Sequence, residues 1–156
     1  MLKKIIKDEM EYLMVSQLVG IWNLRSFVAR DKDGQELKPW GESPLGKLFY
    51  DQSGQMAVVM SQPNRPRFRS PRPFEGSSEE VKAAFENLEA YAGRFEIDSS
   101  SGVITHHVEV CRMPNWEGHP QVRRYEIDGD WLVLHTPLIE VEGTQWTFSF
   151  SWTRDR

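Results

Sequence analysis

Two adjacent histidines are the clearest candidates for chemically active residues in this sequence. His106 and His107 lie within residues 103–111, a run that alternates as a β-strand does, so their side chains face opposite sides of a sheet. The face of His106 is the more apolar one, which favours His106 inside and His107 with Glu109 outside. The alternative is that Glu109 orients His107 in the interior, as a general base would require. A hydrogen-bonded structural histidine without chemistry is a further interpretation.

An arginine and a tyrosine on the next run of residues are the second candidate pair. Arg123 and Tyr125 share a face with apolar Ile127, opposite Arg124 and Glu126. An arginine in an apolar interior needs an anion, either a protein carboxylate or a carboxylate, phenolate or enolate of a ligand. Because consecutive strands of an up-and-down barrel are neighbours, we expect this arginine beside the inward histidine, where both anchor an acidic or enolisable ligand group.

Large aromatic side chains form a row in residues 144–154. Trp146, Phe148, Phe150 and Trp152 fall on one face, and Ser, Thr and Gln fall on the other. Such a row is typical of the concave interior of a partly hollow barrel, since eight strands can just enclose one small ligand; a plain sandwich core is the alternative. The predicted ligand-binding residues are Trp146, Phe148 and Phe150 of this row, Trp116 in a turn, and Arg67 and Phe68 in a Pro/Arg-rich loop over residues 62–74.

These side chains need strands to position them. Alternating runs separated by turn signals predict eight antiparallel strands, over residues 20–29, 45–50, 55–62, 93–98, 103–111, 121–127, 131–136 and 144–154. The fold class is therefore all-β, an up-and-down barrel of about eight strands. We expect a helical extension over residues 1–17 and one barrel domain over residues 18–156.

Two helices are predicted beside the strands. Apolar residues at helical spacing in residues 4–17 indicate an amphipathic helix packed on the core as a lid or plug, with a partner-binding or membrane-surface helix as the alternative. Between the third and fourth strands, Ser77 and Glu80 form a capping box. Val81, Phe85, Leu88 and Ala92 continue it at helical spacing and predict three to four turns.

Several short motifs resemble one family. Gly20-Ile21-Trp22 is similar to the Gly-x-Trp element of lipocalins, in which an arginine near the end of the last strand packs over the tryptophan; Arg154 has the matching position. Further segments at 18–24, 64–68, 106–109, 114–118, 121–123 and 128–132 resemble the bacterial and fungal lipocalin-like domain proteins. The resemblance implies a small calycin-type barrel, and related barrels include carriers, haem binders and biosynthetic cyclases.

Composition excludes several classes of function. The net charge of -4 disfavours nucleic acid as a partner, and no apolar run is long enough to span a bilayer. A single cysteine, Cys111, and the lack of a secretory signal pattern indicate a cytoplasmic protein. The histidine spacing fits no zinc pattern, so we expect no metal and no cofactor, with a haem ligand as the alternative use of one barrel histidine. No protein partner can be inferred.

Two functions fit these features. The first is a binding module that holds a mainly apolar, aromatic or polycyclic ligand with an acidic or enolisable polar end. The alternative is a cofactor-free isomerase, cyclase or lyase such as a dehydratase, with the barrel histidine as acid or base and Arg123 stabilising an oxyanion.

Overall fold

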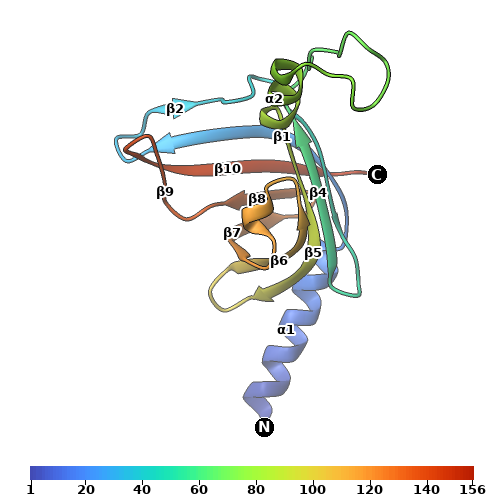
Figure 1. The fold of residues 1–156 in the computed structure, drawn as a ribbon. Helices are drawn as coiled ribbons and strands as arrows, with labels where there is room; N and C mark the ends of the chain where they lie inside the picture. The colour runs from blue at the N-terminus through green and yellow to red at the C-terminus, as the bar shows by residue number, and fades with distance from the viewer.

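One antiparallel sheet forms the body of the molecule and closes on itself (Figure 1). This computed structural model describes residues 1–156, apart from the side chains of Leu2 and Lys7. The strand order is β2-β1-β3-β4-β5-β6-β7-β8-β10-β9, and β1 also pairs with β10. The barrel strands are β1 (Gly20–Asp31), β3 (Leu45–Tyr50), β4 (Gln55–Ser61), β5 (Leu88–Asp98), β6 (Val103–Cys111), β7 (Pro120–Asp128), β8 (Trp131–His135) and β10 (Thr144–Arg154). The short strands β2 (Glu36–Leu37) and β9 (Ile139–Val141) pair only with β1 and β10.

The prediction of an all-β, eight-stranded up-and-down barrel is therefore confirmed. Each barrel strand pairs with its neighbour in the chain, and tight turns join three of these pairs, β3–β4, β5–β6 and β7–β8.

The closing pair β1–β10 also seals the floor of the barrel. Trp22 pairs with Arg154, whose guanidinium carbon lies 4.2 Å from the centroid of the indole ring. Arg154 Nη1 donates to the carbonyl of Val19 at 2.8 Å, and Trp22 Nε1 donates to that of Leu18 at 2.8 Å. The expected stacking of the arginine over the tryptophan is confirmed, and it is accompanied by an acceptor for the buried indole N–H.

Gly20 starts β1 because the floor leaves no space for a side chain there. Its φ of +137° lies in a region that L-residues rarely adopt, and a Cβ would come within 2.8 Å of Arg154 Nη1. The glycine and the arginine of the predicted motif are thus linked by direct packing.

Helix α1 (Leu2–Leu18) leaves the barrel at this closed end (Figure 1). Only its last turns contact the barrel, where Leu18 is fully buried and Met14 and Val15 pack against the core. Ile6 and Met10 remain about half exposed, so the predicted helix exists but does not pack along the core as expected. Among the described residues, no helix is long and apolar enough to cross a membrane.

Helix α2 (Ser78–Glu86) lies at the opposite end (Figure 1) and is shorter than predicted. The capping box is formed as expected: Ser77 accepts from the backbone of Glu80, whose side chain accepts from the backbone N–H of Ser77. The extension of the helix through Leu88 and Ala92 was wrong, since both residues belong to β5. Residues four apart share a face in a strand as well as in a helix, and pairing with β4 makes this segment a strand.

Candidate functional site

The open half of the barrel contains a cavity of about 270 Å³. Its wall is mostly apolar and aromatic, with a small group of polar side chains on one side. The apolar residues of the wall are Phe27, Trp40, Leu48, Val58, Met60, Trp116, Leu134, Ile139, Phe148, Phe150 and Trp152. The polar ones are Glu89, Tyr91, His106, Gln121, Arg123 and Thr136.

Aromatic rings from β1 and β10 form one side of the cavity. Phe27 and Phe150 lie on paired strands and stack with ring centroids 4.7 Å apart, and Phe148 continues the row. Alternation along β10 brings these rings to the inner face. Trp146 has the same parity but lies near the end of the strand, opposite Ile139, and does not border the cavity. Trp116, from the turn before β7, lies in the wall and meets the ring of Tyr91 edge-on.

His106 lies inside the barrel and is 1% exposed. Its Nε2 lies 2.7 Å from the hydroxyl of Tyr50, and its Nδ1 lies 2.8 Å from that of Tyr91. Burial, with smaller contributions from Arg123 and His107, lowers the pKa of His106 to about 3. The imidazole is therefore neutral, and both of its nitrogens are engaged with tyrosines.

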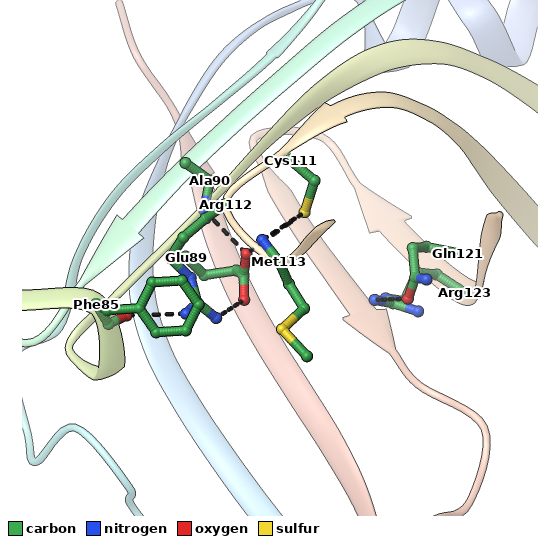
Figure 2. Close-up of polar contacts among 8 residues, drawn as sticks. All are labelled: Phe85, Glu89, Ala90, Cys111, Arg112, Met113, Gln121 and Arg123. Atoms are coloured by element: carbon green, nitrogen blue, oxygen red, sulfur yellow. Dashed lines mark hydrogen bonds and ion pairs between the residues drawn. The ribbon is translucent and has the colours of Figure 1, made fainter. Parts of the chain in front are cut away.

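Arg123 is the one cationic side chain among the described residues of the cavity wall, and it is 8% exposed. Its Nη1 donates to the carbonyl of Val122 at 2.8 Å, and its Nη2 donates to Oε1 of Gln121 at 3.4 Å (Figure 2). Within the described side chains, no carboxylate forms an ion pair with it. Its predicted position beside the histidine agrees with the register of β6 and β7, in which Ile104 pairs with Arg123 and His106 pairs with Gln121.

The other charged group of the wall, Glu89, is already neutralised (Figure 2). Its Oε2 accepts from Arg112 Nη2 at 2.7 Å, and its Oε1 accepts from the backbone N–H of Ala90 at 3.0 Å. Arg112 is fixed in turn by the ring of Phe85, 4.0 Å from its guanidinium carbon, and by the Phe85 carbonyl. Cys111 lies beside this group, where its Sγ accepts from the backbone of Met113. Arg123 is therefore the uncompensated charge in the wall.

Comparison with known proteins identifies the family of this chain. A model of the lipocalin-like domain matches residues 19–155. The chain belongs to the lipocalin-like domain family. A relative in Aspergillus oryzae, named 4'-hydroxy-3'-methoxypropiophenone carrier protein, is 30% identical over 107 residues, which cover 64% of this chain and 96% of the relative. A crystal structure of a lipocalin-like protein from Bacteroides uniformis is similar with a TM-score of 0.41 and 16% identity, covering 85% of this chain and 96% of that one.

Some predicted site residues of this lipocalin-like protein lie away from the cavity. Tyr125 faces inward but does not border the cavity, and burial raises its pKa. Arg67 and Phe68 lie in a small crevice against α2 rather than at the cavity. His107 and Glu109 are on the outer face, where they pair with Glu96 and Arg94 at 3.1 Å each.

Other residues of the cavity wall, and Tyr50, which contacts the wall residue His106, were absent from the sequence-based set. Tyr91 was assigned to the predicted helix, so its inward position on β5 could not be recognised. Tyr50 has the parity of its buried neighbour Leu48 and could have been found by the same alternation rule. Phe27 could not, because a bulge between Leu24 and Ser26 reverses the alternation that Trp22 and Leu24 begin. The sequence did not indicate that Glu89 borders the cavity, because the orientation of its side chain depends on the ion pair with Arg112. The described residues contain no group of three or more His, Cys, Asp or Glu side chains that could hold a metal ion.

Proposed function

We propose that this lipocalin-like barrel binds a small aromatic molecule, with an acidic or enolisable oxygen of the ligand placed against Arg123. The observation that carries the proposal is the buried guanidinium that borders the cavity without a carboxylate partner. A buried charge without a counter-charge is costly, and an anionic or strongly polar ligand oxygen relieves that cost. Bonds from a charged donor are also stronger than those between neutral groups.

The size and lining of the cavity support a compact aromatic ligand. A volume of about 270 Å³ is just below the usual range for small-molecule sites, which run from about 300 to 1,000 Å³. A ligand of one or two rings fits this space better than a larger polycyclic one. The name of the A. oryzae relative describes a carrier of a phenolic aryl ketone, which is a single ring with polar oxygens at its ends. We infer a ligand of the same chemical class here.

The geometry of the histidine favours binding over acid–base chemistry. A general base needs a free nitrogen within reach of the substrate proton. Both ring nitrogens of His106 are engaged by buried tyrosine hydroxyls. We therefore propose a binding or carrier role that needs no cofactor, and the isomerase, cyclase or lyase alternative stays a prediction. A cytoplasmic location likewise stays a prediction.

Calorimetric titration with 4'-hydroxy-3'-methoxypropiophenone tests the proposal. The wild-type protein is expected to bind with one site per chain, and Arg123→Gln is expected to bind about 10- to 100-fold more weakly. Arg124→Gln is the matched control, because Arg124 is the next residue on β7 and is exposed on the outer face. Equal losses in both variants, or no binding of this ligand or of simpler aryl ketones to the wild type, would refute the proposal.

A further inference from the structure

Tyr50, His106 and Tyr91 form a buried chain of hydrogen bonds whose protons can be counted. Each tyrosine has one O–H, and a neutral imidazole has one N–H and one acceptor nitrogen. His106 is neutral because burial holds its pKa far below its ordinary value. The chain therefore has three protons and two contacts, one at 2.7 Å and one at 2.8 Å. Each contact uses one proton, so one tyrosine O–H is left over.

The surroundings of the two tyrosines decide which of them keeps the hydroxyl proton that is not used in the chain. Tyr50 is 2% exposed, pairs with Gly20 at the closed end, and packs against the ring of Phe95 at a centroid distance of 4.6 Å. Among the described side chains, His106 is its only hydrogen-bond partner. A buried hydroxyl proton without an acceptor is costly, so Tyr50 donates to Nε2. Nδ1 then carries the imidazole proton and donates to the oxygen of Tyr91.

Tyr91 differs from Tyr50 because it borders the cavity. Arg123 lies in the same wall, and its positive charge acts on the Tyr91 hydroxyl. The oxygen of Tyr91 thus accepts from Nδ1–H of His106. Its own O–H remains and is available to a molecule in the cavity.

We propose that Tyr91 selects the polar group of the ligand by donating its hydroxyl proton to an acceptor oxygen, and that Tyr50 and His106 are positioning residues that hold it in this role. The inference rests on the proposed function, because the ligand must occupy the cavity. A carbonyl or an ionised oxygen accepts from both Tyr91 and Arg123. A group that can only donate, such as an ammonium, meets donors alone and is excluded.

The tautomer of His106 is measurable without any ligand. A long-range 1H–15N correlation spectrum of protein labelled with 15N-histidine reports which ring nitrogen carries the proton. His106→Gln assigns the resonance among the four histidines. We expect a neutral imidazole protonated at Nδ1. Protonation at Nε2, or an imidazolium at neutral pH, would overturn the assignment of Tyr91 as donor whatever the protein binds.

A pair of ligands of the same shape tests the selection itself. Acetophenone has a carbonyl oxygen where α-methylstyrene has a CH2 group, so the two differ mainly in one acceptor. The wild type is expected to prefer acetophenone about tenfold in calorimetric titration. Tyr91→Phe is expected to reduce the preference to the part that Arg123 supplies, and Tyr50→Phe to reduce it together with a change in the His106 tautomer. Tyr125→Phe is the matched control, because Tyr125 is buried but lies outside the cavity wall.

The outcomes separate this inference from the proposed function. If both ligands bind the wild type equally well, Tyr91 does not select an acceptor, and the proposal of a small aromatic ligand stands. If neither binds, the proposed function fails. A preference of undiminished size in Tyr91→Phe would also overturn the inference, because another group would then supply the whole of it.

Discussion

Protonation of His106 is expected to limit the stability of the barrel in acid. The pKa of this histidine falls from its ordinary value of 6.5 to about 3 in the folded protein, mainly through burial. Between these two values the unfolded chain binds a proton at this position and the folded chain does not. The free energy of unfolding therefore falls as the pH is lowered below about 6.5, and this contribution levels off only below about pH 3.

The magnitude follows from the pKa difference. At about pH 5 the unfolded histidine is 1.5 pH units below its pKa of 6.5, and each unit corresponds to about 1.4 kcal/mol. The expected loss from this group alone is about 2 kcal/mol between neutral pH and pH 5. A side chain that does not titrate at the same position, such as glutamine, does not contribute this pH-dependent loss.

Urea unfolding of wild type and His106→Gln at both pH values measures this difference. The variant is expected to be less stable at neutral pH but to lose about 2 kcal/mol less than the wild type on acidification. His107→Gln, on the outer face, is the matched control and is expected to keep the pH dependence of the wild type. If wild type and His106→Gln lose the same free energy, the folded histidine is not held neutral, and the assignment of a buried uncharged imidazole is refuted.

Three further changes test the floor, the cavity and α2. Arg154→Met removes the stacking on Trp22 and the hydrogen bonds to the carbonyls of Val19 and Gln17, so urea unfolding should show a loss of about 2–3 kcal/mol; unchanged stability would contradict the proposed floor. Leu134→Trp places a large ring in the cavity, so calorimetry should detect no aryl ketone binding while circular dichroism stays that of a β-barrel; retained affinity would place the ligand elsewhere. Ser77→Ala removes the helix cap, so hydrogen exchange in α2 should indicate a local loss of about 1 kcal/mol; a change in ligand affinity would contradict the separation of α2 from the cavity.

Side-chain alternation along the strands determined which face of each strand is buried. His106 shares its face with Ile104 and Val108, and burying that face brings the histidine inside. The same rule brings Arg123 inward on β7 and Phe148 and Phe150 inward on β10. These assignments follow from local pattern because a strand repeats every two residues and one face must leave water. The closed floor was predicted from the resemblance of Gly20, Trp22 and Arg154 to the motif of lipocalins, in which an arginine packs over the tryptophan.

Tertiary structure decided what the inward residues do. Tyr91 and Tyr125 both face the interior, yet only Tyr91 borders the cavity, because depth along the barrel depends on the register between strands. Leu88 and Ala92 suit a helix or a strand equally by spacing, and pairing with β4 selected the strand. Glu89 is neutralised by Arg112 and not by Arg123, since that contact depends on how β5 and β6 meet at the barrel rim. The hydrogen bonds among Tyr50, His106 and Tyr91 require that β3, β6 and β5 bring these three side chains together. No local pattern in one strand specifies that arrangement.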